Sequence, residues 1–304
     1  MIEALTLSII TAATPLLLAA TGELVAERSG VLNLGVEGMM VVGAVSAFAA
    51  ALMTGSPLVG VLAGAVAGVA MAFLFAVLAV WLATNQVATG LALTLFGLGV
   101  AGLAGDSFVG RPGVSLDPIH VPVLSDLPFI GPVLFGQDLL FYASVAITVG
   151  VGFFLFRSRA GLRLRSVGDD PAAAHAIGIS VLGTRTAAVL FGGLCAGLAG
   201  AQLTLVYTPQ WIDNIAAGRG WIALALVVFA SWRPLRVVAG AYLFGAVTIG
   251  QFNAQALGIA LPAQLLSSLP YLATIVVLVV IASNRRFTMI NTPASLGQPF
   301  VPDR

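Results

Sequence analysis

The feature that most constrains this chain is a succession of long apolar segments separated by short polar ones. A helix needs about 20 mostly apolar residues to cross the hydrocarbon core of a bilayer. The sequence therefore predicts an all-α polytopic membrane protein, a bundle of about nine transmembrane helices with a range of eight to ten. The segments are residues 5–21, 33–54, 57–82, 87–104, 139–156, 186–204, 219–232, 236–252 and 264–283. The seventh and eighth of these are short.

Charged side chains are too scarce to cover a water-soluble surface. They make up 8% of the 304 residues, against 59% for hydrophobic residues, whereas a soluble domain carries about 25% charged residues. We therefore expect residues 1–285 to form one transmembrane domain in contact with a lipid bilayer, with no nucleic-acid partner. Residues 286–304 are polar and contain three prolines, a composition that predicts a disordered tail.

The arginines predict an orientation, because cytoplasmic loops are enriched in positive charge. If the loop 157–185 is cytoplasmic, alternation of the nine spans places eleven of the 13 basic residues inside. Only Arg111 and Arg219 then lie outside. The N-terminus is predicted to be outside the cell, and the C-terminal tail is predicted to be cytoplasmic.

The loop 157–185 contains a stretch with the signals of a short helix, GDDPAAAHAIGIS. Asp170 is suited to cap free backbone N–H groups, Pro171 fits the first helical position, and Gly178 favours termination. A helix of two turns is marginal on its own. We therefore expect it to dock, either on its own membrane or on a cytoplasmic partner.

A second polar stretch, GVLNLGVEGMM, begins the second apolar segment. Its glycines favour a kink or a close approach between helices. Asn33 and Glu37 are four residues apart and would share one face of a helix, which inside a membrane must point to protein or water. We expect Glu37 about one turn from the interface. The face is either a polar contact between helices or part of a pathway.

Signatures of catalysis are absent from the sequence. It contains no phosphate-binding loop, no HExxH and no Cys/His cluster. His120 and His175 are predicted on opposite sides of the membrane, and Cys195 is expected to be a small packing residue. We therefore expect no enzymatic activity, no metal and no cofactor in this chain.

Three stretches together resemble the permease subunits of bacterial ABC importers: GELVAERSGVLNLGVEGMMVVGA, GLRLRSVGDDPAAAHAIGI and GRGWIALALVVFASWRP. Within that group the chain is similar to the branched-chain amino acid, ribose and simple-sugar permeases, and most of all to the smaller permease of nucleoside-type systems. The resemblance extends over residues 10–285. It implies a bacterial inner-membrane protein that forms the pathway for a small polar solute, a nucleoside or a simple sugar.

The resemblance also implies partners. Such a permease pairs with a second, related permease and with two ATPase subunits that bind ATP, and an extracytoplasmic binding protein delivers the solute. The short helix is then the coupling helix that meets the ATPase, although the glutamate typical of that loop is not matched here. The residues assigned to this contact are Asp170, Pro171, Ala172, Ala173, Ala174, His175 and Gly178.

A neutral polar solute would suit a pathway with few charges inside the membrane. Polar residues in or beside the predicted spans are candidates for its lining, and each could instead bond one helix to another. They are Asn33, Glu37, Asn85, Gln86, Thr89, Thr94, Gln202, Tyr207, Gln251 and Asn253. In the outer loop that follows, Trp211 and Asp213 are candidates for contact with a binding protein, or for an interfacial aromatic belt.

Two other classes of protein remain compatible with the sequence. An ion-coupled secondary carrier of a small polar metabolite would have a similar number of spans, but should show coupling-ion groups near the midplane, which are scarce here. A purely structural membrane subunit would explain the apolar bundle but not the capped helix in a basic loop.

Overall fold

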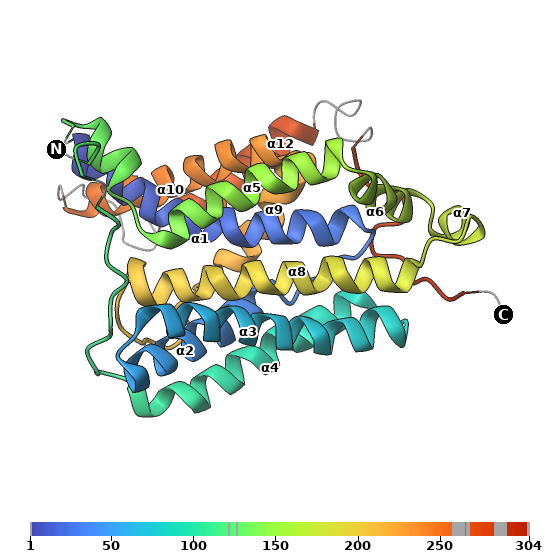
Figure 1. The fold of residues 1–304 in the computed structure, drawn as a ribbon, viewed down its shortest axis with the longest axis horizontal. Helices are drawn as coiled ribbons and strands as arrows, with labels where there is room; N and C mark the ends of the chain where they lie inside the picture. Colours follow the sequence, from blue (N-terminus) through green and yellow to red (C-terminus); the bar gives the residue numbers. More distant parts are fainter. Residues whose placement is uncertain are drawn as a thin grey trace.

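The computed structural model describes residues 2–120, 122–125, 127–256, 265, 268–282 and 291–302. Within these residues all regular structure is helical, and extended chain pairs only in an isolated bridge between Pro112 and Gln210. The expected all-α class is confirmed. The long helices run side by side along the longest axis of the molecule (Figure 1).

Among the described residues, seven helices are long and apolar enough to cross a membrane. They are α1 (Ile2–Arg28), α2 (Val36–Thr54), α3 (Pro57–Ala76, continued by the π-helical turn η1 to Trp81), α4 (Gln86–Gly105), α5 (Leu139–Arg157), α8 (Val181–Gln202, continued by η4 to Tyr207) and α10 (Pro234–Ala256). The part of the chain that the structure describes also contains the shorter α-helices α6 (Arg159–Asp169), α7 (Pro171–Ala176), α9 (Arg219–Phe229) and α12 (Leu269–Ala282).

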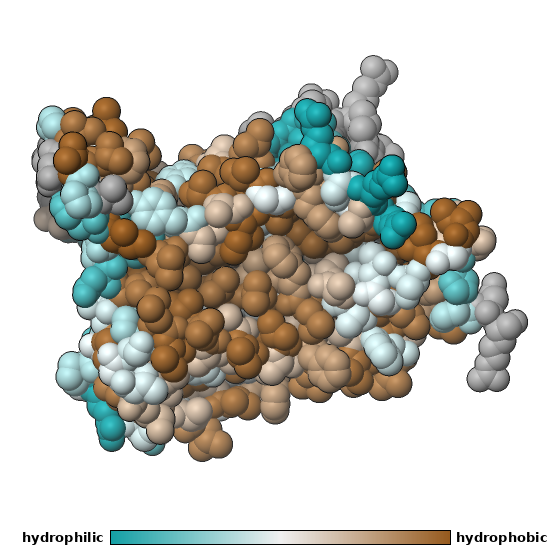
Figure 2. Space-filling view, viewed as in Figure 1, coloured by the Kyte–Doolittle hydropathy of each residue, from teal (hydrophilic) through white to brown (hydrophobic). Residues whose placement is uncertain are grey.

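The expected count of nine spans is not confirmed. All nine predicted segments contain helix, but α9 has 11 residues, which is too short to span a bilayer alone. Helix α12 has 14 described residues. Part of the ninth segment, 264–283, lies outside the described residues. Apolar side chains cover the middle of the face shown in Figure 2, and hydrophilic ones gather towards its two ends, as a membrane requires.

Helices α1, α2, α3 and α8 form the centre of the bundle through glycines at their crossings. A Cβ on Gly43 of α2 would come within 2.7 Å of the Gly197 backbone in α8, and one on Gly68 of α3 would meet the same glycine at the same distance. Without a driving force from water, helices in lipid associate through such close backbone packing. Cys195 lies buried in the same part of α8, as expected of a packing residue.

Residues 29–35 link α1 to α2 as non-helical chain inside the bundle. Gly38, in the first turn of α2, packs against Leu93 and Thr94 of α4, and Gly97 of α4 packs back on Gly38. Gly97 lies about 16 Å of helix rise from Gln86, the start of α4. Helix α2 therefore begins deep in the bundle, level with the middle of α4.

One end of the bundle carries α6, α7 and residues 291–302, and we call it the α7 end (Figure 1). The start of α1 and the connection between α4 and α5 lie at the opposite end. The prediction of a disordered tail does not hold for residues 291–302. Ser295 is buried, and its N–H and hydroxyl both donate to the Gly168 carbonyl at the end of α6, at 3.0 and 2.7 Å.

Candidate transport and coupling site

Glu37 binds the N-terminus of α9. Its two carboxylate oxygens accept hydrogen bonds from the N–H groups of Gly218, at 2.7 Å, and Gly220, at 2.6 Å. These N–H groups have no partner within the helix, so the first turn of a helix favours a carboxylate. Gly220 allows the approach, because a Cβ there would lie 2.6 Å from the Glu37 backbone. Glu37 is thus a buried clasp between α2 and α9.

The expected depth and surroundings of Glu37 need correction. It was expected one turn from an interface on the same helical face as Asn33. Asn33 lies before α2 begins, and its side-chain oxygen accepts from the Gly35 N–H at 2.9 Å. The non-helical segment 29–35 moves the start of α2, and Glu37 with it, towards the middle of the bundle.

Glu23 and Glu27, both on α1, are buried next to that segment and complete a second polar cluster. Glu23 accepts a hydrogen bond from the Asn33 N–H at 3.1 Å. Glu27 accepts from the indole N–H of Trp232 at 2.6 Å, and Arg28 donates to the carbonyl of the same tryptophan at 3.1 Å. The stretch from Glu23 to Glu37 therefore makes several buried hydrogen bonds to other parts of the chain. One oxygen each of Glu23 and Glu27 has no hydrogen-bond partner among the described residues.

Two more of the predicted polar residues join this segment from α4. Gln86 accepts from the Leu32 N–H at 2.8 Å, and Thr94 donates to the Leu34 carbonyl at 2.9 Å. Because non-helical chain leaves backbone groups unpaired, side chains from a neighbouring helix must satisfy them. Gln86 and Thr94 therefore bond one helix to another in this structure.

The other predicted pathway residues lie elsewhere. Asn85 caps α4 by accepting from the Ala88 N–H, and Thr89 is bonded to Thr84. Gln202, fully buried on α8, donates to Asp138 at 3.4 Å. Tyr207 lies under the Arg219 guanidinium, 4.8 Å from its ring centroid.

Gln251 and Asn253 lie on α10, and the side chain of Asn253 donates to the Ile249 carbonyl within that helix. The hydrogen bonds of these candidates therefore join them to separate parts of the bundle. Two apolar grooves on the flanks of α5 contain none of them.

Helix α7 has the local structure that the sequence predicts. The Asp170 carboxylate caps it by accepting from the Ala173 N–H at 2.9 Å, Pro171 is its first residue, and Gly178 adopts a left-handed φ of +85° after it. Only Ala174 is buried within the helix, and Ile177 beyond its end is 76% exposed. The helix stands at the tip of the molecule, with most of its apolar surface uncovered (Figures 1 and 2).

The C-terminal segment 291–302 joins α7 to the polar stretch near α1. Phe300 packs its ring edge against His175, with centroids 5.6 Å apart, and contacts the buried cluster that includes Ala174. Gly297 donates from its N–H to the Gly30 carbonyl at 3.1 Å.

Arg185 ties the same segment to α8 and α1. It donates to the Gln298 carbonyl at 2.9 Å, to the Ser295 hydroxyl at 3.1 Å and to the Ser29 carbonyl at 3.2 Å. Gln86 of α4 also donates to Gln298, at 3.4 Å. The segment is a strap that holds four helices together at the α7 end.

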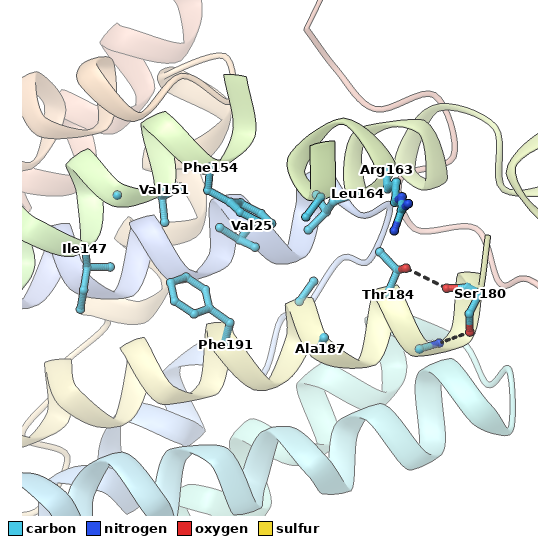
Figure 3. Close-up of a pocket in the computed structure, with 14 residues that line it drawn as sticks. Val25, Ile147, Val151, Phe154, Arg163, Leu164, Ser180, Thr184, Ala187 and Phe191 are labelled. Atoms are coloured by element: carbon cyan, nitrogen blue, oxygen red, sulfur yellow. Dashed lines mark hydrogen bonds between the residues drawn. The ribbon is translucent and has the colours of Figure 1, made fainter. Parts of the chain in front are cut away.

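An open groove of about 680 Å³ lies between α5 and α6 on one side and α8 on the other. Figure 3 shows Ile147, Val151, Phe154 and Phe191 along its length, with Val25 of α1 as its floor. A second groove of about 670 Å³ lies on the other flank of α5, against α1 and α10.

The expected role of Trp211 as a contact for a binding protein is contradicted. Its side chain is 1% exposed and packs against Gly105 at the end of α4, where a Cβ would overlap the indole. Because Gly105 has no side chain, the Trp211 indole can fill the space between the helix and the loop. Asp213, two residues later, is exposed.

Sequence reasoning missed Glu23, Glu27, Arg185 and Ser295. The first two lie four residues apart on an extension of α1 that runs to Arg28, seven residues beyond the predicted span. Their spacing on one helical face was the available signal. Arg185 and Ser295 gave none, because their contact joins residues 110 positions apart in the sequence.

Comparison with known proteins places the chain in a family. Residues 5–282 match the family described as "branched-chain amino acid transport system / permease component". A protein of Haloferax volcanii provisionally named as a glucose ABC transporter permease is 40% identical over 95% of this chain and 94% of its own length.

Two further relatives have names of the same kind. The nucleoside ABC transporter permease of Lactococcus lactis subsp. cremoris is 32% identical over 87% of this chain and 88% of its own length. The guanosine ABC transporter permease of Bacillus subtilis is 32% identical over 77% of each chain. The chain belongs to this family of ABC transporter permease subunits and is a multi-pass membrane protein.

Proposed function

We propose that this chain forms part of the membrane pathway of an ATP-driven importer for a nucleoside or a simple sugar. Family membership over residues 5–282 is the observation that carries the proposal. It favours the importer over an ion-coupled secondary carrier and over a purely structural subunit. The relatives are named for nucleosides, guanosine and glucose, which are all neutral polar solutes.

The proposed partners are a second, related permease, two ATPase subunits and an extracytoplasmic binding protein. ATP binds to the ATPase subunits, and this chain holds no cofactor. We place the α7 end in the cytoplasm. Arg28, Arg157 and the arginines of α6 lie at this end, as positively charged cytoplasmic loops require.

Single-cysteine labelling in intact cells tests this orientation. In a Cys195→Ala background, Asp117→Cys at the opposite end should react with an impermeant maleimide, and Asp169→Cys at the α7 end should react only after lysis. Both positions are exposed, so a lack of reaction reports sidedness and not burial. Labelling of Asp169→Cys from outside would reverse the orientation.

Helix α7 is the proposed docking site for the ATPase. It is only six residues long, it is capped by Asp170, and its apolar surface has little cover. A helix this short is not stable by itself. The strap through Phe300 supports one side of it, and the ATPase covers the other. The contact surface comprises Asp170, Pro171, Ala172, Ala173, His175 and Gly178. Ala174 is buried and supports the helix from within this chain.

The test is co-purification of the ATPase with tagged permease carrying Ala173→Glu. Ala173 is exposed, so the charge should leave the fold intact and remove the ATPase from the complex. Ala294→Glu is the matched control, because Ala294 is an exposed alanine at the same end. Equal ATPase recovery with both variants would contradict docking at α7.

The clasp between Glu37 and α9 is the proposed gate. Helix α9 begins inside the bundle, and half-helices with buried ends mark the pathway in other transporter folds. Opening would break the two hydrogen bonds to Gly218 and Gly220 and let α9 tilt. The remaining pathway candidates, Asn33, Asn85, Gln86, Thr89, Gln202, Gln251 and Asn253, contribute through the helices that they join.

A further inference from the structure

The groove between α5, α6 and α8 has the composition of a phospholipid site. Its walls are apolar along α5 and α8, with Ile147, Val151 and Phe191 among them. Arg163 of α6 projects across one end of it, towards Ser180 and Thr184 at the start of α8 (Figure 3). An apolar trough that ends in a cation matches an acyl chain below a charged headgroup.

Arg163 has an uncompensated charge. Among the described residues no hydrogen bond or ion pair reaches its guanidinium, and the side chain is exposed. The Ser180 hydroxyl accepts from the Gly183 N–H but still has its own proton to donate. A phosphate placed between Arg163 and Ser180 would satisfy both donors with charge-assisted hydrogen bonds.

The size and depth of the groove also fit. Its volume of about 680 Å³ lies within the range of small-molecule sites, about 300–1,000 Å³. From Phe154 to Ile147 the α5 wall covers about 10 Å of helix rise, directed away from Arg163 towards the middle of the span. Basic pockets between transmembrane helices bind anionic lipid headgroups in other membrane proteins.

We propose that this groove binds one anionic phospholipid, with its phosphate at Arg163 and Ser180 and an acyl chain between α5 and α8. The charge selects the occupant. A helix of another protein would fill the apolar part but would leave the guanidinium unpaired, whereas a neutral phospholipid would add its own cation close to Arg163.

The experiment is native mass spectrometry of the full chain released from nanodiscs made of equal parts phosphatidylcholine and phosphatidylglycerol. The wild type should retain one phosphatidylglycerol in preference to phosphatidylcholine. Arg163→Gln should lower that retention about tenfold, because the charge-assisted hydrogen bond to the phosphate is lost. Arg159→Gln is the control, because it removes the same charge from the same helix outside the groove.

A second pair of variants tests the apolar part. Gly150 lines the groove, and a Cβ there would meet nothing within 4 Å. Gly150→Leu should therefore fold normally and displace the lipid. Gly99→Leu, on α4, has the same open surroundings and lies outside the groove, so it should retain the lipid. Ala187→Leu, on the α8 wall, repeats the test from the opposite side if Gly150→Leu expresses poorly.

Four outcomes would overturn the proposal. One is equal retention of both lipids by the wild type, and another is equal retention by Arg163→Gln and Arg159→Gln. If Gly150→Leu and Ala187→Leu retain the lipid as the wild type does, the apolar groove does not hold the acyl chain and Arg163 binds the lipid only at the surface. Loss of protein–protein association in Gly150→Leu, with no lipid found in the wild type, would assign the groove to a partner helix.

Discussion

The two motif-bearing segments of this chain have opposite surroundings. Residues 23–37 are buried, and their polar groups bond to α1, α4, α9 and Trp232 within the same chain. Residues 170–178 project from the tip of the α7 end, where only Ala174 is buried. The first segment has most of its polar groups bonded inside the chain, apart from one carboxylate oxygen each of Glu23 and Glu27. The second has a surface still to be covered.

This difference separates two ways in which a motif can act. A buried polar network is destabilised by any change that removes a partner, because the remaining group stays unsatisfied. An exposed apolar helix tolerates substitution without loss of fold, and the effect appears in what binds to it. Each of the variants below tests one side of this contrast.

The largest effect is expected for Gly38→Leu. A Cβ at Gly38 would lie 2.7 Å from both the Leu93 carbonyl oxygen and the Thr94 Cα, so α2 and α4 must separate. Overpacking costs about 1–3 kcal/mol where side chains can yield, and backbone atoms yield less, so we expect more than about 3 kcal/mol.

Thermal unfolding of the detergent-solubilised protein measures this loss. Gly102→Leu on α4 is the matched control, since a Cβ there meets nothing within 4 Å. Normal expression and stability of Gly38→Leu would show that the crossing of α2 and α4 is not a rigid part of the buried segment.

Glu37→Gln should cost about 1–3 kcal/mol, the range for a buried group left unsatisfied. Both oxygens of Glu37 accept from N–H groups of α9, and glutamine offers only one oxygen. Its amide group would face a second donor. We expect lower thermal stability and lower solute uptake, with the ATPase still bound. Glu3→Gln, at an exposed position, is the control. Equal stability of the two variants would contradict a stabilising contact between Glu37 and α9.

Phe300→Ala tests the support that the strap gives to α7. Aromatic pairs such as Phe300 and His175 contribute about 0.5–1.5 kcal/mol, so local opening of residues 171–179 should become about fivefold more frequent, with little change in global stability. Hydrogen exchange followed by mass spectrometry measures this. Val301→Ala, the exposed neighbour, serves as control. If both leave exchange unchanged, α7 is stable without the strap.

The smallest effect on stability is expected for Ile177→Ser. The side chain is 76% exposed, and surface substitutions usually stay within about 0.5 kcal/mol. ATPase recovery should fall nonetheless, because an apolar contact is lost at the proposed interface. Val109→Ser, exposed at the opposite end, should change neither quantity. A clear loss of stability in Ile177→Ser would place this residue with the buried segment.

Local features of the chain were predictable from the sequence. The cap at Asp170, the first helical residue Pro171 and the left-handed Gly178 were all expected and are confirmed. Each depends on groups within a few residues, where backbone preferences are strong. The apolar segments were located for the same reason, since a helix in lipid must satisfy its own backbone.

Other expectations were wrong where contacts with distant segments determine the conformation or burial of a residue. Asn33 was placed on a helix, but its loop is held by Glu23, Gln86 and Thr94 from other helices. Trp211 was expected at a surface, and the gap beside Gly105 buries it. Polar composition predicted disorder for residues 291–302, and hydrogen bonds with Gly168 and Arg185 fix them instead.

The sequence by itself determined the apolar helices, the capped α7 and the family, because these depend on composition, short-range spacing and the order of motifs. Tertiary structure alone decided that Glu37 closes the N-terminus of α9 and that Arg185 binds the C-terminal strap. The physical reason is that a buried polar group takes whichever partner the folded chain brings within about 3 Å. Here the partners are 181 and 110 residues away.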